Sequence, residues 1–177
     1  MGDDASDYSA FISYASPDGE KAGQICASLE ARGLRCWIAP RDVRPGQEYG
    51  QEIIRGIEAS RCLVLVLSEA ANESSFVRRE VERAVSKKKP VFPIRVEDVV
   101  PSPSLELFVA STHWIDAWSG RLIDHVERLA ATLTDESALA AGHDLSQRIK
   151  RRRQMPRWIT LAGAFAGIVL AIVIGNR

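Results

Sequence analysis

The chain has 177 residues, of which 46% are hydrophobic, and its 23 basic and 23 acidic side chains cancel. This length supports one domain with a sizeable core and is too short for two ordinary domains. The charge balance removes the general electrostatic argument for a nucleic-acid partner.

The cysteines and histidines do not have the spacing of a disulfide framework or a metal site. Three cysteines lie scattered in apolar surroundings, which is typical of reduced core thiols in a cytosolic domain. None of the three histidines has ligand spacing to a cysteine or an acid. We therefore expect no metal.

Strands and helices are expected to alternate after a polar, flexible N-terminus at residues 1–7. Apolar runs rich in branched residues predict strands, and apolar residues at helical spacing predict helices. The expected strands are 8–14, 34–39, 62–67, 90–96 and 112–115. The expected helices are 16–33, a helix through 53–57, 75–89 and 121–133, with one further helical turn at 105–109.

This alternation predicts an α/β fold with a flavodoxin-like, doubly wound, five-stranded parallel sheet over residues 8–134. In such sheets ligands bind outside the carboxyl ends of the strands. The loops expected there are Ala15–Ser16, Pro40–Gln47 and Ser68–Ser75. The sequence therefore predicts a binding site built from these three loops.

Glu80 stands out within the helix expected at 75–89. At about 100° per residue, Glu80 falls on an apolar arc formed by Phe76, Val77, Val81, Ala84 and Val85. A carboxylate on such an arc is costly unless it is paired or the arc opens onto a pocket. A pocket-facing Glu80 and one at the margin of the arc, reaching solvent or paired with Arg83, both fit the pattern.

The C-terminal part of the chain changes character after the predicted domain. Residues 135–157 form a charged linker that becomes strongly basic from Arg148. Residues 158–174 carry no charge and are about long enough to cross a bilayer core of roughly 30 Å, so a single transmembrane helix is expected, with a buried globular helix as the alternative. The basic side would place the preceding domain in the cytoplasm.

Several short motifs follow one another along the predicted domain. They are Ala10-Phe-Ile-Ser-Tyr14, Gly33-Leu-Arg-Cys-Trp37, Arg41-Asp-Val-Arg-Pro-Gly46, Leu65-Val-Leu-Ser68 and Phe76-x-x-x-Glu80. In their order and spacing they resemble the Toll/interleukin-1 receptor (TIR) domain family in its bacterial form, over about residues 6–133.

The resemblance implies an activity and a site. Many TIR domains cleave the bond between nicotinamide and ribose in NAD⁺, some with cyclisation, and others are scaffolds that only self-associate. The family's catalytic glutamate corresponds to Glu80. The resemblance assigns the nucleotide pocket to Tyr14, Ala15, Ser16, Asp42, Arg44, Gly46, Tyr49 and Phe76.

Two of these positions depart from the family pattern. Ala15 and Ser16 stand where some relatives carry arginines, and Phe76 stands where bacterial members often carry tryptophan. Both departures concern substrate affinity more than chemistry. A single carboxylate is consistent with the reaction, because nicotinamide leaves NAD⁺ as a neutral molecule and needs no general acid, unlike the leaving group of an ordinary glycosidase.

The sequence therefore predicts a membrane-anchored NAD⁺ hydrolase or cyclase, activated by TIR self-association in signalling or defence, with NAD⁺ as substrate and no cofactor. The alternative is a non-catalytic adaptor in which Pro40–Gln47 binds partner proteins. A receiver-like phospho-acceptor is rejected, because Tyr14-Ala15 and Leu67-Ser68 supply no acidic cluster at the strand ends.

Overall fold

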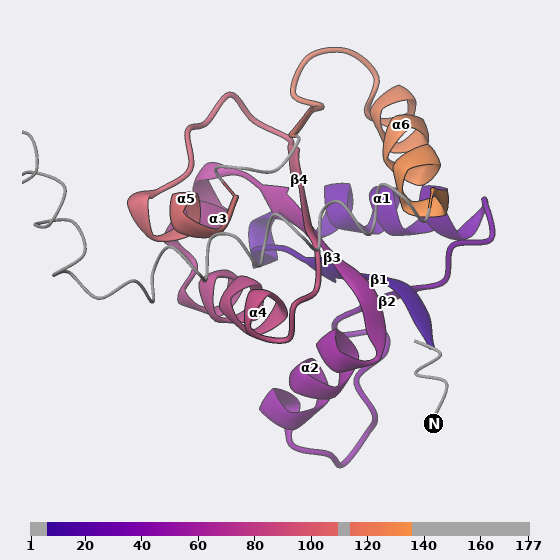
Figure 1. Cartoon of the computed structure of the whole chain (residues 1–177), viewed down its shortest axis with the longest axis vertical. Coiled ribbons are helices and arrows are strands. Elements are labelled where there is room, and N and C mark those ends of the chain that lie inside the picture. The colour runs from indigo at the N-terminus through magenta and orange to yellow at the C-terminus, as the bar shows by residue number, and fades with distance from the viewer. Residues whose placement is uncertain (1–6, 110–113, 136–177) are drawn as a thin grey trace, which may run out of the picture. The chain divides into compact units, whose positions relative to one another are not determined.

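The computed structural model describes residues 7–109 and 114–135 (Figure 1). Within them, five parallel strands form one sheet in the order β2-β1-β3-β4-β5. The strands are β1 (Tyr8–Ser13), β2 (Cys36–Ile38), β3 (Ser60–Leu67), β4 (Val91–Arg95) and β5 (Ile115–Asp116). This order confirms the predicted flavodoxin-like, doubly wound fold.

Helices cover both faces of the sheet (Figure 1). One apolar core joins α1 and α6 to the sheet, and a second joins α2, α4 and α5 to its other face. Their bounds are α1 (Gly19–Glu30), α2 (Tyr49–Glu58), α4 (Ser75–Ser86), α5 (Pro103–Val109) and α6 (Leu122–Thr134).

The central strands are buried on both sides because their side chains alternate between the two cores. In β1, Ala10 and Ile12 belong to the core under α1 and α6, whereas Phe11 belongs to the core under α2 and α4. The same alternation places Ser13 on the α2 and α4 side, at the carboxyl end of the strand. The first strand therefore presents one hydroxyl to the helices that form the site.

The segment expected to be a loop at Ser68–Ser75 contains a short helix, α3 (Glu69–Glu73). Ser68 begins it, because the Ser68 hydroxyl accepts a hydrogen bond from the Ala71 N–H at 3.0 Å. Ser74 caps α4 in the same way by accepting from the Val77 N–H at 3.2 Å. Another short helical turn, η1 (Ser16–Asp18), precedes α1.

Helix α2 lies close to the sheet because residue 56 has no side chain. Trp37 on β2 is fully buried and stacks on Phe11, with ring centroids 4.9 Å apart. A Cβ atom at Gly56 would lie 2.6 Å from two atoms of the Trp37 ring. This contact sets the height of α2, which forms one wall of the site.

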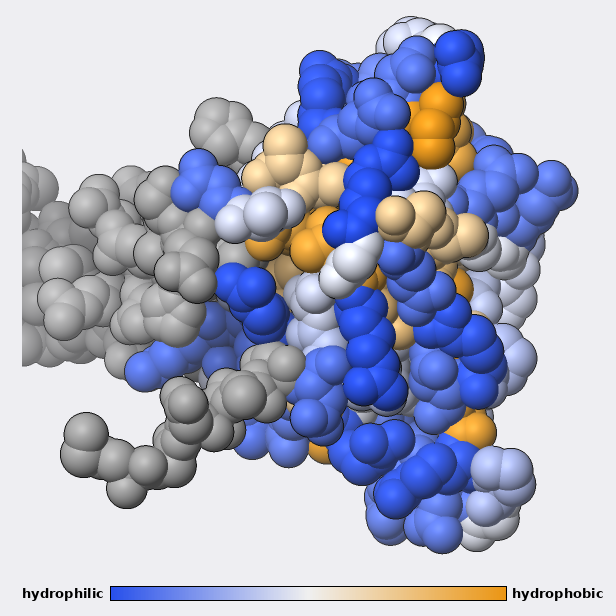
Figure 2. Space-filling model, turned by 90° about the vertical axis from the view of Figure 1, so that its right-hand side faces the viewer, coloured by the Kyte–Doolittle hydropathy of each residue, from blue (hydrophilic) through white to orange (hydrophobic). Residues whose placement is uncertain are grey.

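One face of the domain is largely polar. Figure 2 shows a mostly hydrophilic face on which hydrophobic residues form small separate spots. No helix within residues 7–109 and 114–135 is long and apolar enough to span a bilayer. The predicted transmembrane helix at 158–174, the linker at 135–157 beyond residue 135 and the N-terminal residues 1–6 lie outside the described residues.

Candidate functional site

Glu80 is brought to the carboxyl end of β1 by helix α4. The Ser13 hydroxyl donates a hydrogen bond to Glu80 Oε2 at 2.6 Å, although the two residues are 67 positions apart. Ser13 is fully buried and Glu80 is partly buried. The carboxylate thus faces the strand end rather than open solvent.

Burial raises the pKa of the Glu80 carboxyl to about 7, and the Ser13 hydrogen bond opposes part of that rise. Burial acts in this direction because the ionised form loses solvation, whereas a donor to the carboxylate stabilises that form. A carboxyl with a pKa near neutral pH, located at a strand end, is a feature of functional sites.

Two cavities meet at Glu80 and Tyr49, which line both. The first, called here the loop cavity, has a volume of about 270 Å³. Its walls also contain Tyr14 and Ser16 from the segment after β1, and Ala39 and Pro40 from the segment after β2. It therefore lies at the predicted edge of the sheet.

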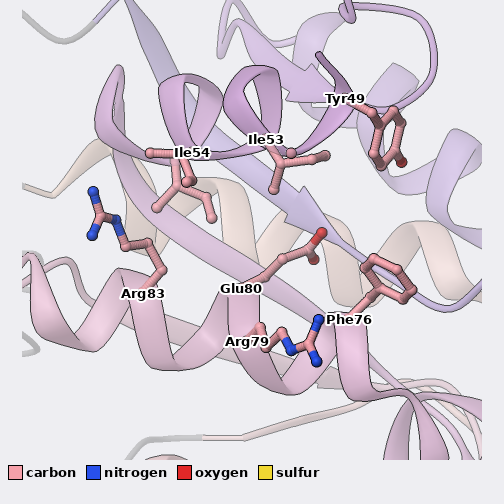
Figure 3. A pocket seen from close by; sticks show the side chains of 9 residues that line it. Tyr49, Ile53, Ile54, Phe76, Arg79, Glu80 and Arg83 are labelled. Atoms are coloured by element: carbon pink, nitrogen blue, oxygen red, sulfur yellow. The ribbon is translucent and has the colours of Figure 1, made fainter.

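The second cavity, called here the helix groove, lies between α2 and α4 and has a volume of about 310 Å³. Figure 3 shows the Glu80 carboxylate pointing from α4 towards α2, with Phe76 and Tyr49 on one side and Arg83 on the other. Ile53 and Ile54 form the α2 wall. Glu80 is thus open to both spaces.

The two tyrosines of the loop cavity respond to the Glu80 charge. Burial raises the pKa of Tyr14 above its ordinary value, and Tyr49 and Glu80 add to that rise. The pKa of Tyr49 is raised by burial and by Glu80. The Tyr14 hydroxyl donates to the Ala39 carbonyl at 2.5 Å, so it joins the ends of β1 and β2.

The structure brings some of the predicted site residues together and holds others elsewhere. Tyr14, Ser16 and Tyr49 line the loop cavity with Glu80, and Phe76 lines the helix groove. Ala15 is buried in the core, and neither cavity is lined by Asp42, Arg44 or Gly46.

Asp42 and Arg44 hold the loop after β2 in place. Asp42 accepts a hydrogen bond from the Ile38 N–H at 2.8 Å. Arg44 pairs with Glu52 at 2.7 Å, and the hydrogen bonds from Arg44 and Arg55 lower the pKa of the Glu52 carboxyl to about 2. These contacts connect the loop to β2 and α2, and a role of these residues with substrate stays a prediction.

Two details of the predicted α4 arc differ in the structure. Phe76 does not face the core, because 65% of it is exposed in the first turn of α4. Arg83 does not pair with Glu80, because its guanidinium is 2.5 Å from Glu58. The pocket-facing alternative for Glu80 is therefore the one that the structure adopts.

Ser13 was not among the predicted site residues. The sequence did contain a signal for it. Ser13 is a polar residue in an apolar strand, and it lies two residues after Phe11, so both side chains lie on the same face of the sheet. Periodicity alone could not pair it with a residue 67 positions away. The described residues contain no group of histidine, cysteine and acidic side chains that could hold a metal ion.

The comparisons with known proteins agree with the fold. Residues 10–134 match the TIR domain family. The TIR domain of the Toll-related receptor TRR-2 from Hydra magnipapillata is similar in structure, with a TM-score of 0.63 at 20% identity over 72% of this chain and 99% of that one.

Two further similarities concern longer proteins. A metazoan TIR-STING receptor from C. gigas, solved in complex with 2′,3′-cGAMP, has a TM-score of 0.59 at 25% identity, covering 73% of this chain and 41% of that one. The stimulator of interferon genes protein of Magallana gigas is 38% identical over 79 residues, which are 44% of this chain and 19% of that protein.

This chain matches only part of the two longer relatives. This chain spans about a fifth of the curated Magallana protein and about two fifths of the TIR-STING receptor. All three proteins come from animals, so the comparisons support the TIR domain and do not support the expected bacterial form.

Proposed function

The chain belongs to the TIR domain family, and from this premise we propose that it is an NAD⁺ hydrolase that uses Glu80 to cleave the bond between nicotinamide and ribose. One observation carries the proposal. The Glu80 carboxylate is bonded to a buried hydroxyl at a strand end and opens onto both cavities.

The reaction needs one carboxylate of this kind. As the bond from ribose C1′ to the nicotinamide nitrogen breaks, both electrons leave with nicotinamide, which becomes neutral. The ribosyl group gains positive charge, which an adjacent carboxylate stabilises. Water then bonds to C1′ and loses a proton, giving ADP-ribose, or a nucleophile within the same molecule gives a cyclic product.

The surroundings of Glu80 suit this role. Its pKa near 7 means that the free protein holds the carboxyl partly protonated at neutral pH. The cationic nicotinamide ring of NAD⁺ favours the ionised form when it binds beside Glu80, since an opposite charge nearby lowers the pKa of a carboxyl. Ser13 holds one carboxylate oxygen, Oε2, in a fixed position by its hydrogen bond.

The test is NAD⁺ loss and nicotinamide release by the full chain, compared with Glu80→Gln. We expect the substitution to lower the rate by about 10²–10³-fold or more, the effect of removing one preorganised electrostatic group. Glu82→Gln is the matched control, because Glu82 is exposed on the same helix and lines neither cavity. It should retain the rate of the unmodified chain.

The alternatives give different results in the same assay. NAD⁺ loss that survives Glu80→Gln would assign the reaction to another group. No NAD⁺ loss at any protein density would favour the non-catalytic adaptor. We also propose that the chain self-associates through its TIR domain and is anchored to a membrane by residues 158–174, with the domain on the cytoplasmic side.

A further inference from the structure

The helix groove has no assigned role in the chemistry at ribose C1′. It extends from Glu80 and Tyr49 between α2 and α4, and its volume of about 310 Å³ exceeds that of the loop cavity. Ile54 and Phe76 line it and are 42% and 65% exposed, so apolar surface is accessible along the groove. A molecule held at Glu80 can extend along this space.

The groove also carries a cation without an acidic partner. Of its two arginines, Arg83 is paired with Glu58 at 2.5 Å. Arg79 makes no ion pair with the described residues, and its guanidinium lies 5.9 Å from the centroid of the Phe76 ring. An exposed guanidinium beside an apolar wall remains available to an anionic ligand.

The loop cavity offers no comparable cation. The segment after β1 carries Ala15 and Ser16, and the arginines in the segment after β2 already have carboxylate partners. Arg41 pairs with Glu30 at 2.9 Å and Arg44 with Glu52 at 2.7 Å. Among the described residues at the site, the free positive charge therefore lies on the groove side of Glu80.

We infer that the helix groove binds the adenosine diphosphate part of the substrate, with Arg79 pairing with the diphosphate and the neighbouring exposed Phe76 ring receiving the adenine. The inference rests on the proposed function for the identity of the substrate. Each part of the ligand meets matching chemistry, since guanidinium groups bind phosphate oxygens in pairs and purine rings stack on apolar and aromatic side chains.

Calorimetric titration of the full chain with ADP-ribose tests the groove without requiring turnover. We expect Arg79→Gln to weaken binding about tenfold to a hundredfold, the usual range for losing a hydrogen-bonded charge. Arg79→Lys should restore part of the affinity, because lysine keeps the charge but not the planar fork. Arg78→Gln is the matched control, since Arg78 is exposed on the same helix and lines neither cavity.

Nicotinamide riboside, which lacks the adenosine diphosphate part, serves as the control ligand in the same titration. Its binding should be the same for the unmodified chain and for Arg79→Gln. Equal ADP-ribose affinities for Arg79→Gln and Arg78→Gln would overturn the inference, as would no ADP-ribose binding by the unmodified chain.

The same variants separate this inference from the proposed function. If ADP-ribose binding depends on Arg79 but the chain does not consume NAD⁺, the nucleotide site in the helix groove is supported and the proposed hydrolase activity is contradicted. If NAD⁺ cleavage depends on Glu80 but not on Arg79, the hydrolase activity is supported and the adenosine diphosphate part binds outside the helix groove.

Discussion

Among single residues, Ser13 influences the charge state of Glu80 through a hydrogen bond. Its hydroxyl hydrogen bond lowers the pKa of the carboxyl, while burial raises that pKa by a larger amount. Since the ionised carboxylate is the form that would stabilise a cationic ribosyl group, the balance between these two effects sets the pH range of the proposed reaction.

We predict that kcat/KM for NAD⁺ rises with pH and levels off above about pH 7, because the free protein loses the Glu80 proton there. Ser13→Ala removes the donor to the carboxylate and so raises the pKa of Glu80, and the rise of kcat/KM should therefore occur at higher pH. Rates measured from about pH 5 to pH 9 check this. A rise at the same pH in Ser13→Ala would contradict the role given to Ser13.

The same carboxyl should cost stability at high pH. Folding raises the Glu80 pKa from 4.5 to about 7, so the folded state binds the proton more tightly than the unfolded state. Its contribution is therefore favourable below pH 4.5 and is lost as pH rises through about 7. At 1.36 kcal/mol per pKa unit, the loss is about 3 kcal/mol.

Glu80→Gln should escape this loss because glutamine does not ionise. We predict similar free energies of unfolding for the variant and the unmodified chain near pH 4, and a more stable variant near pH 8. Urea unfolding at both pH values measures the difference. A gap between the two proteins that is the same at both pH values would show that Glu80 is not destabilised by burial.

The residue-level predictions from sequence succeeded where periodicity was informative. Glu80 could be singled out because a carboxylate interrupts an apolar arc. The exposure of Phe76 could not be predicted, since it depends on how α4 packs against the rest of the domain and not on the period of the helix. Ser13 was missed because its partner comes from a distant part of the chain.

At the level of elements, the packing of α2 on the sheet depends on Gly56. We predict that Gly56→Ala destabilises the chain by about 1–3 kcal/mol, the usual cost of inserting a methyl group into a filled core. The Trp37 ring cannot give way easily, because it is buried and stacked on Phe11. Urea unfolding provides the measurement.

Gly23→Ala is the matched control within a helix. A Cβ atom at Gly23 would meet nothing within 4 Å, so only the helix propensity changes. Alanine should stabilise α1 by about 0.5–1 kcal/mol. If both substitutions stabilise the chain, the contact between Gly56 and Trp37 does not limit how closely α2 packs.

The sequence pattern predicted the longer helices and strands but not the short helix α3. The long strands and amphipathic helices followed from apolar periodicity, whereas α3 was missed because five residues are too few to show a helical period. The ion pair between Arg44 and Glu52 could also not be predicted from the sequence, because it depends on the path of the loop after β2. Sequence patterns identified this loop as part of the site edge but not how its charges are paired.

For the whole molecule, the proposed self-association and membrane anchor make activity depend on density. We predict that NAD⁺ loss per molecule of the full chain rises as its surface density in lipid vesicles increases, because tethering raises the effective concentration for pairing. The assay varies the protein-to-lipid ratio at constant protein amount. A rate per molecule that is independent of density would argue against activation by pairing.

The overall fold was the part most fully predictable from sequence. Alternating strand and helix patterns and the preference for right-handed crossovers leave few arrangements, and the observed order β2-β1-β3-β4-β5 is one of the two common doubly wound orders. The joining of two cavities at Glu80 could not be predicted in this way, because it depends on the depth at which α2 and α4 pack.

The position of β1 between β2 and β3 has a consequence for synthesis of the protein. Tyr8 pairs with Ser60, and the bond to Glu80 requires α4 as well, so the first strand to leave the ribosome has to wait for much later segments. At about 5–20 residues per second, that wait lasts several seconds. A nascent chain that has not yet emerged as far as α4 therefore has no complete site, and the proposed reaction cannot begin before that helix has packed against β1.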